Sequence, residues 1–342
     1  MRYVTQPVNW GWSMGKRSRF LSVAAIGFAA ALYSSAALAQ SFPTRPMTIV
    51  VPFGVGSALD LIARIIGPRL AEELGQPVLV ENVSGGGGMT AAARVANSPP
   101  DGHQMLHGGV DVMSMNQSLY KKSLYNAQTD FVPVGLVGDQ ALVLLARNDF
   151  PANDMQQFIA YTKANHAKMQ FGSGGAGSGA HLNCLRVNAA IGVDVTHVSY
   201  RGSAQAFQDL FAGRIDYYCA LGAAASGPIE NKSAKGIAIL TRDRSPLFPG
   251  LPSAHEQGLT NFHADFWTGL FVPKGTPEPI VQKLNQAIQV TLNTPSVQER
   301  LLKIAVTAVA PERRSPAYLK SFVESETKLW EGIIKTSGVI LE

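Results

Sequence analysis

The stretch MTIVVPFGVGSALDLIARIIGPRLAEELG, residues 47–75, decides which fold class this chain is expected to adopt. It starts with an apolar run typical of a buried strand, followed by the turn PFGVG at 52–56. Apolar residues then recur at spacings of three and four from Leu59 to Leu74, which predicts an amphipathic helix ending at Gly75. A strand, a glycine turn and a helix form the repeating unit of a parallel α/β sheet.

The same unit recurs along the chain, and glycine and serine runs at 84–88 and 172–178 again join a predicted strand to a predicted helix. No repeat is visible at the level of single residues. The expected strands are 47–51, 78–81, 104–107, 142–146, 169–171, 195–200, 215–219, 236–240 and 266–272. The expected helices are 59–74, 90–96, 155–164, one from about 179, 204–211, 279–292 and 318–334, the last with Tyr318, Phe322, Leu329, Trp330 and Ile333 facing the core.

This order predicts an α/β fold of two lobes, each a mainly parallel sheet flanked by helices, joined by two crossings. Residues 40–140 and 264–342 would form lobe 1, and residues 141–263 would form lobe 2. We expect Trp267 and Trp330 to be buried in the core, because both lie on apolar faces.

Composition excludes several classes of protein. Of the 342 residues, 46% are hydrophobic and 15% charged, which does not fit disorder, and no run of 18 apolar residues follows residue 40. The only cysteines, Cys184 and Cys219, are too few for a cysteine-based zinc site or an iron–sulfur cluster. They could pair with each other if their Cα atoms lie within about 7 Å, and the sequence leaves this open. We expect no metal and no cofactor.

The first 39 residues have the parts of a secretory signal peptide. They contain four basic residues and no acid, an apolar run at 20–32, and ALA at 37–39 before Gln40. Translation from Met14 would give a signal of ordinary length. Without this segment the net charge falls from +5 to +1, which argues against nucleic-acid binding. We expect export to the periplasm.

The three glycine turns predict an anion site. Ligands of α/β sheets bind outside the carboxyl ends of strands, where helix N-termini offer unpaired N–H groups. Ser57 and Asp60 also fit a capping box, in which the carboxylate returns to the N-cap amide. His181, three residues after Ser178, is either a donor to the ligand or a satisfied core histidine.

The sequence contains little that indicates an enzyme. Gly172, Gly174 and Gly177 form a GxGxxG pattern, but no acid follows the next strand to bind a ribose hydroxyl. The phosphate-binding lysine motif and the GxSxG elbow are both absent from the sequence. A hydrolase or lyase acting on a carboxylate remains the alternative from another functional class.

From residue 43 to its C-terminus the chain resembles Bug-type receptors, the exported solute-binding components of tripartite tricarboxylate transporters. The motifs that carry the resemblance are PTRP at 43–46, VVPF at 50–53 with Asp60, EN at 81–82, PDG at 100–102, Asn116 with LY at 119–120, DFVPV at 130–134, the residues from Ser173 to His181, YRG at 200–202, WTGL at 267–270 and PKGTP at 273–277.

The resemblance implies a two-lobed periplasmic binding protein fold of the type II kind. It also implies a small organic carboxylate in the interlobe cleft, delivery to permease subunits, and no catalysis. We expect a monomer; a receptor feeding a sensor kinase is a further alternative. The candidate ligand-binding residues are Phe53, Gly54, Gly56, Ser57, Ala58, Asp60, Ser173, Gly177, Ser178, His181, Tyr200, Gly202 and Ser203.

Departures from the family pattern concern the ligand. Members often carry Asp or Asn after the strand at 215–219, where this chain has Ala220 and Leu221, and Val55 and Val83 add no donor. A cleft wall poor in donors favours a carboxylate with an apolar body over citrate or aspartate, because a second buried charge would lack a partner. The other interpretation is that residues 220–225 start a packed helix outside the cleft.

Overall fold

The computed structural model describes residues 1–9, 42–200, 202–260, 262, 264, 266–338, 340 and 341. Most of the predicted signal peptide, with its cleavage site, lies outside the described residues, as does Arg201. The chain divides into two compact units, and the fold below is that of the second, Arg45–Glu342. None of the described helices is long and apolar enough to cross a membrane.

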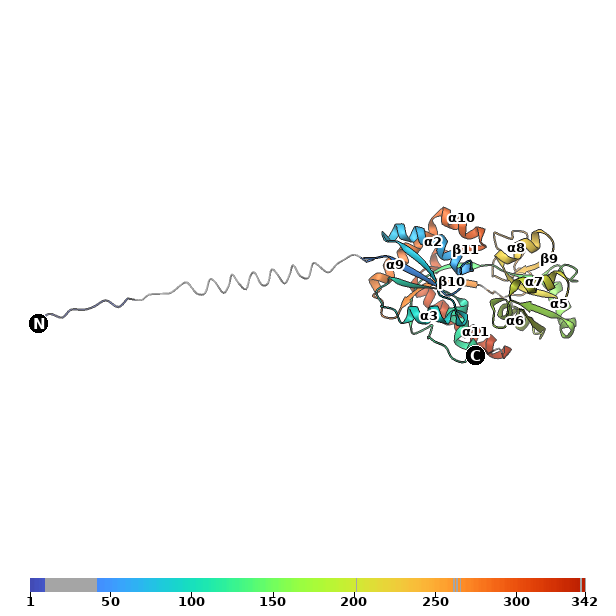
Figure 1. The fold of residues 1–342 in the computed structure, drawn as a ribbon, viewed down its shortest axis with the longest axis horizontal. Coiled ribbons are helices and arrows are strands. Elements are labelled where there is room, and N and C mark those ends of the chain that lie inside the picture. The colour runs from blue at the N-terminus through green and yellow to red at the C-terminus, as the bar shows by residue number, and fades with distance from the viewer. Residues whose placement is uncertain are drawn as a thin grey trace. The chain divides into compact units, whose positions relative to one another are not determined.

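Within the described residues, two sheets form the fold, and we name the lobes after them (Figure 1). Lobe 1 has a six-stranded sheet in the order β11-β4-β10-β3-β1-β2, and lobe 2 a five-stranded sheet in the order β7-β6-β8-β5-β9. The strands of lobe 1 are β1 (Met47–Val51), β2 (Val78–Asn82), β3 (Gln104–Gly109), β4 (Phe131–Gln140), β10 (Phe266–Pro273) and β11 (Val306–Ala308). Those of lobe 2 are β5 (Leu142–Arg147), β6 (Gln170–Ser173), β7 (Thr196–Ser199), β8 (Tyr217–Leu221) and β9 (Ala234–Ile239).

In each lobe most strands share one direction, as expected, but the sheets are mixed, with parallel and antiparallel pairs. In lobe 1, β1 pairs in parallel with β2 and β3, and β10 is antiparallel to β3 and β4, so β1 to β4 share one direction. In lobe 2, β6 to β9 share one direction and β5 opposes them. The chain passes between the lobes twice, from β4 to β5 through Ala141 and from β9 back to β10.

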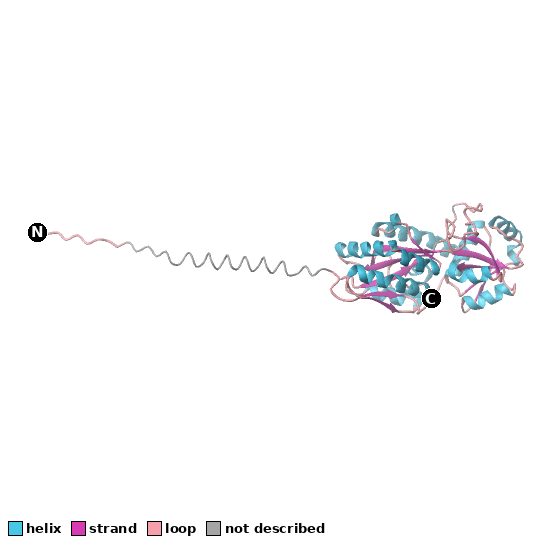
Figure 2. Cartoon of the chain, turned by 90° about the horizontal axis from the view of Figure 1, so that it is seen from above, coloured by secondary structure: helices cyan, strands magenta, loops and turns pink. Residues whose placement is uncertain are grey.

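Helices flank both sheets (Figure 2). Alternation along β10 separates two faces in lobe 1: a Cβ at Gly269 would meet Leu319 of α11, whereas Gly135, the partner of Leu270, lies against α9. The helices of lobe 1 are α2 (Ala58–Leu74), α3 (Met89–Ala96), α4 (Asn116–Leu119), α9 (Glu278–Asn293), α10 (Pro295–Lys303) and α11 (Pro316–Ser337). Those of lobe 2 are α5 (Met155–Asn165), α6 (Gly179–Ile191), α7 (Ser203–Phe211) and α8 (Gly222–Glu230).

The sequence pattern misses β4, the longest strand of lobe 1. Pro133, Gly135 and Gly138 break the apolar run that would predict it. The structure explains both glycines, since a Cβ at Gly135 would lie 3.0 Å from the Arg314 carbonyl oxygen and one at Gly138 would lie 2.7 Å from Val306. Neighbouring chain segments approach β4 so closely that glycine is required at these positions, and the apolar residues that usually indicate a strand are absent there.

The core face of the final helix includes four of the five expected positions and extends beyond them. Leu319, Val323, Trp330 and Ile334 of α11 are buried, whereas Leu329 is 37% exposed. Tyr318, Phe322 and Ile333 are partly buried and pack against the core. Leu329 is therefore the one predicted position that lies outside this face. Trp267 and Trp330 are buried as predicted, and both indole N–H groups donate to Glu326 Oε2, at 3.2 and 3.3 Å.

Cys184 of α6 and Cys219 of β8 form a disulfide, with Cα atoms 5.5 Å apart. The bond holds the helix that starts at the third glycine turn against a central strand of lobe 2. Both cysteines are buried in the apolar core. The orientation of α6 is therefore fixed covalently as well as by packing.

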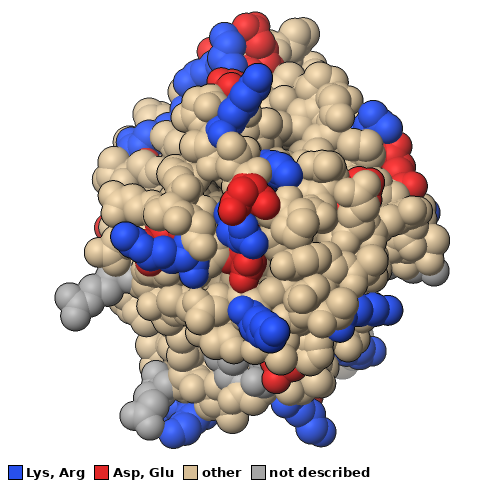
Figure 3. All heavy atoms as spheres, turned by 90° about the vertical axis from the view of Figure 1, so that its right-hand side faces the viewer, with Lys and Arg blue, Asp and Glu red and all other residues tan. Residues whose placement is uncertain are grey.

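Charged side chains of both signs are interspersed over the end of the molecule that carries α7 and α8 (Figure 3). Lobe 2 contains ion pairs such as Arg214–Asp209 at 2.7 Å and Arg244–Glu256 at 3.0 Å. Such exposed pairs contribute little stability, about 0–1 kcal/mol each.

We predict that replacing both cysteines (Cys184→Ala with Cys219→Ala) lowers the free energy of unfolding by about 3–4 kcal/mol. The bond closes a loop with a sequence separation of 35, and its loss restores that freedom to the unfolded chain. Denaturant unfolding measures the effect. A reductant should shift the wild-type midpoint by a similar amount and leave the double variant unchanged; a loss below about 1 kcal/mol would contradict the prediction.

Candidate functional site

The first and third glycine turns have the same structure, which reveals a repeat that sequence inspection missed. Residues 54–61 read GVGSALDL and residues 175–182 read GAGSGAHL. In each turn the serine N–H donates to the carbonyl oxygen of the first glycine at 3.1 Å, and the second glycine has a positive φ, 83° or 75°. The serines, Ser57 and Ser178, cap α2 and α6 with nearly identical ψ angles of 159° and 158°. Each lobe therefore presents one such helix N-terminus.

The two turns differ in the side chain that folds back onto the second glycine. Gly56 N–H donates to Asp60 Oδ2 at 2.9 Å, and Gly177 N–H donates to His181 Nδ1 at 3.0 Å. Asp60 therefore returns to the residue before the N-cap, rather than to the N-cap amide that a capping box uses. The difference gives the two helix ends different charge environments.

Asp60 is buried, and its carboxylate is held by neighbours within lobe 1. Burial opposes the charged form, but hydrogen bonds from Arg64, from the Gly56 N–H and from Asn82 keep the pKa of Asp60 below its usual value. Its negative charge lies at the N-terminus of α2 and offsets the positive end of that helix.

His181 places no charge at the N-terminus of α6. Its ring stacks on His197 with centroids 3.7 Å apart, and burial, aided by His197, lowers the pKa of His181 to about 4. Because Nδ1 accepts from Gly177, the ring proton lies on Nε2. This neutral ring leaves the positive end of α6 uncompensated.

A cavity of about 270 Å³ lies beside this uncompensated end. Asp111 belongs to lobe 1, Leu142 and Phe266 start the strands next to the two crossings, and the remaining lining residues belong to lobe 2. The cavity is lined by Asp111, Leu142, Gly174, Ser178, Gly179, Ala180, Gly202, Ser203, Phe207, Tyr218, Cys219, Leu221, Ala224 and Phe266.

Three helices begin at this cavity. Ser178 is the N-cap of α6, Gly202 that of α7 and Leu221 that of α8, and all three line it. Each helix N-terminus has unpaired N–H groups and about half a positive charge. No Lys, Arg or His is among the described residues that line the cavity. The donors that the described lining residues offer to an anion are therefore backbone amides and hydroxyls.

Two serine hydroxyls add donors at the same end. Tyr218 Oη donates to Ser203 Oγ at 2.9 Å, and the His181 N–H donates to Ser178 Oγ at 3.4 Å. Because both oxygens accept from the protein, each can donate its own hydrogen to a ligand. Gly174 permits this crowding, since a Cβ there would lie 3.0 Å from Ser203 Oγ.

The cavity collects only some of the predicted site residues. Ser178, Gly202 and Ser203 line it. Ser173 is buried and donates to the Gly175 carbonyl oxygen at 2.9 Å, and Tyr200 donates to Asp209 at 2.8 Å. The other predicted site residues also do not line it: Phe53, Gly54, Gly56, Ser57, Ala58 and Asp60 in lobe 1, and Ser173, Gly177, His181 and Tyr200 in lobe 2.

Sequence reasoning missed Asp111, Phe207, Tyr218 and Phe266. Asp111 closely follows the carboxyl end of β3, where ligands of α/β sheets bind, but a single acid after a strand is too common to mark a site by itself. The sequence indicates candidate sites only at the glycine turns and at the motifs of the family resemblance, and Asp111 belongs to neither. Leu221 and Ala224 also line the cavity, so the segment 220–225 is both a helix start and part of the wall.

Asp111 is the only ionisable carboxyl group among the described lining residues. It begins the π-helical turn Asp111–Met115, and its Oδ1 accepts from the Val112 N–H at 2.8 Å. Burial, opposed by that hydrogen bond, raises the pKa of Asp111 to about 6. At neutral pH it is therefore a carboxylate held at a cost in stability, which is common at functional sites.

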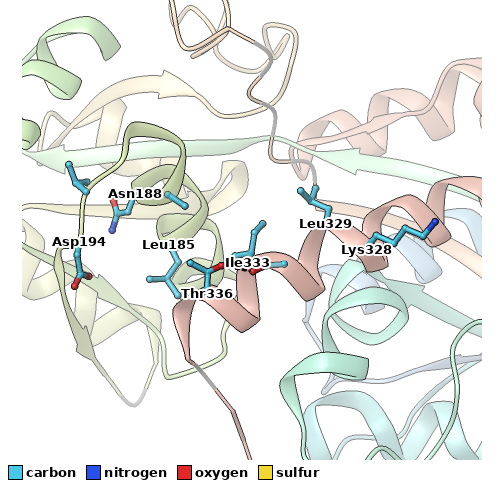
Figure 4. Close-up of a pocket in the computed structure, with 10 residues that line it drawn as sticks. Leu185, Asn188, Asp194, Lys328, Leu329, Ile333 and Thr336 are labelled. Atoms are coloured by element: carbon cyan, nitrogen blue, oxygen red, sulfur yellow. Dashed lines mark hydrogen bonds between the residues drawn. The ribbon is translucent and has the colours of Figure 1, made fainter.

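A larger hollow of about 780 Å³ lies between α6 and α11 (Figure 4). Leu185 and Asn188 of α6, with Asp194 beyond its end, line one side. Leu329 and Ile333 of α11 line the other. It adjoins the C-terminal halves of both helices, the negative ends of their dipoles, although Lys328 also lines it. Among the described residues no group of three or more His, Cys, Asp or Glu could hold a metal ion.

We predict that Asp111→Asn changes how stability depends on pH. The folded chain raises this pKa from 3.8 to about 6, so the stability associated with the protonated form is complete below about pH 4 and is lost as pH rises through 6. Asparagine stays neutral. The variant should match wild type near pH 4 and exceed it by about 1–3 kcal/mol near pH 8, measured by denaturant unfolding. A difference that does not vary with pH would contradict this.

Comparison with known proteins places the chain in a family. Residues 62–339 match the tripartite tricarboxylate transporter family receptor. A Pseudomonas sp. protein from the tcbD-tcbE intergenic region is 35% identical over 90% of this chain and 92% of its own length. BugT of Bordetella pertussis is 31% identical, over 95% and 99% respectively.

Solved structures agree. MatC of Rhodopseudomonas palustris with bound malate is 38% identical, with a TM-score of 0.71 over 86% of this chain and 100% of that one. The periplasmic binding protein BugD is 33% identical, with a TM-score of 0.72 over 88% and 100%. An R. palustris protein with adipate is 31% identical, with a TM-score of 0.73 over 87% and 99%. With this fold and these relatives, the chain belongs to the Bug-type solute-binding receptors of tripartite tricarboxylate transporters.

Proposed function

We propose that this receptor is exported to the periplasm and captures a small organic carboxylate in the cavity between its lobes. It would then deliver the ligand to the permease subunits of a tripartite tricarboxylate transporter, without catalysis. The observation that carries the proposal is the convergence of the α6, α7 and α8 N-termini on one cavity. The malate and adipate bound by two relatives support a carboxylate.

The donors suffice for useful affinity. Each partly buried helix N-terminus contributes up to about 2 kcal/mol, and each neutral donor about 1 kcal/mol. Three helix ends and the hydroxyls of Ser178 and Ser203 approach the roughly 8 kcal/mol of micromolar binding. The walls add Leu142, Phe207 and Phe266, which can bury an apolar body at about 25 cal/mol per Å².

The proposal also requires the lobes to close. It divides the mature chain into lobe 1 (40–140 with 264–342) and lobe 2 (141–263), which is supported by the membership of the two sheets. The lobe 1 turn at 53–58 has the same geometry as its counterpart but does not line the cavity. Rotation about the two crossings would bring it toward the ligand. A monomer suffices for such a site, and no nucleic acid is involved.

A hydrolase or lyase finds less support. Ser178 and Ser203 line the cavity, but within the described part of the chain neither hydroxyl donates to a histidine or a carboxylate. An activated nucleophile needs such a base. Binding without turnover is therefore the expected outcome.

We predict that monocarboxylates with an apolar body, such as benzoate or 3-methylbutanoate, raise the melting temperature more than citrate does. A ligand at 100 times its dissociation constant adds about 2.7 kcal/mol of stability. Thermal shift measures the response, and chromatography of the incubated ligand tests for turnover. A product formed from a stabilising ligand, or a response to citrate alone, would contradict the proposal.

Two variants separate binding from folding in the same assay. Ser178→Ala should weaken binding by about 1–2 kcal/mol, more than it destabilises the unliganded fold, because Ser178 lines the cavity. Asp60→Ala is the comparison and should lower the unliganded melting temperature more than Ser178→Ala does, since Asp60 holds the lobe 1 turn through Gly56 and Asn82. Unchanged affinity in Ser178→Ala would mean that the cavity is not the binding site.

A further inference from the structure

The polar groups of the cavity are sorted by type. Hydrogen-bond donors lie at the lobe 2 end, where three helices begin and the hydroxyls of Ser178 and Ser203 are located. The acceptor Asp111 comes from lobe 1. Phe207, Leu221 and Phe266 provide apolar walls. A ligand that satisfies this arrangement carries an acceptor at one end and a donor at the other.

The position of Asp111 is rigid. Tyr125 Oη donates to the Val112 carbonyl oxygen and so fixes the turn next to the carboxyl group, and Tyr125 is itself buried. A Cβ at Gly109 would lie 2.9 Å from Asp111 Oδ1, so the carboxyl group packs over a residue without a side chain. The group is thus held in place before any ligand binds.

A purely structural role does not account for an acid here. The hydrogen bond from the Val112 N–H to Oδ1 is one that asparagine could accept equally well. The aspartate instead carries a charge into a half-buried site, and burial raises its pKa. None of the described lining residues is a cation, and a buried carboxylate without one is costly unless a ligand supplies a donor.

We infer that Asp111 selects the ligand by accepting a hydrogen bond from its distal end, so that the receptor binds monocarboxylates bearing a distal hydroxyl or ammonium group. The inference rests on the proposed function, since the carboxylate end is assigned to the helix N-termini. A ligand with a second carboxylate would face Asp111 with like charge and bind more weakly.

Two sets of ligands, each of a single chain length, test this inference directly. Calorimetry near pH 7.5 compares hexanoate, 6-hydroxyhexanoate, 6-aminohexanoate and adipate, which differ only in the distal group, and repeats the comparison with butanoate, 4-hydroxybutanoate, 4-aminobutanoate and succinate. At one length or both, we expect the hydroxyl or ammonium ligand to bind about tenfold more tightly than the unsubstituted acid. Such a factor is typical of a hydrogen bond to a charged group. The dicarboxylate should bind more weakly than the donor-bearing acids.

Two substitutions assign the effect to Asp111. Asp111→Leu should abolish the preference for both donor-bearing acids. Asp111→Asn should reduce the ammonium preference and strengthen binding of the dicarboxylate about tenfold, because the like charge is gone. Asp194→Asn is the control, since it removes a carboxylate from the hollow between α6 and α11 and should leave all affinities unchanged. Melting curves of each variant verify folding.

The possible outcomes distinguish failure of this inference from failure of the proposed function on which it rests. Equal affinity across each set in wild type, or a donor preference that survives Asp111→Leu, overturns the inference while carboxylate binding stands. Tightest binding of adipate or succinate by wild type overturns it in the same way. Failure of every carboxylate to bind contradicts the proposed function and removes the basis of the inference.

Discussion

Backbone amides at helix N-termini are the main groups that the described residues offer to an anion in this cavity, and the rest of the site follows from that constraint. Unpaired amides are available at helix N-termini, so several helices have to begin at the same point. In lobe 2 this requires three strand ends to lie side by side and the turns after them to be short. Gly174 permits this close approach, because a side chain there would meet Ser203 at the start of α7.

The repeated turn shows how one backbone arrangement can serve different electrostatic purposes. Both copies cap a helix through serine and satisfy the second glycine N–H through the residue three after that serine. Asp60 places a carboxylate directly at the start of α2, whereas His181 is neutral because burial disfavours its protonation. The uncompensated positive helix end therefore lies in lobe 2, and the cavity lies beside it.

Much of the fold was predictable because the spacing of apolar residues and the positions of glycine and proline indicate the same elements over most of the chain. The strand at Met47–Val51 and the helix ending before Gly75 are as expected. The strand β4 was not predictable. Its glycines are required by close contact with Arg314 and Val306, which are distant in sequence. The disulfide likewise depends on a Cα separation that no spacing reveals.

The candidate site was only partly predictable. Glycine and serine turns pointed to Ser178, Gly202 and Ser203 because helix starts have a local signature. Asp111 has none: a single acid after a strand is common, and its importance comes from facing a cavity formed mainly by the other lobe. Shape and burial, which are tertiary properties, supply that information.

A crystal structure of the receptor with a bound monocarboxylate tests the central claim most directly. The account predicts carboxylate oxygens within hydrogen-bond distance of the first-turn N–H groups of α6 and α7 and of the Ser178 and Ser203 hydroxyls. A carboxylate bound instead in the hollow between α6 and α11, or paired with a lysine or arginine side chain, would contradict it.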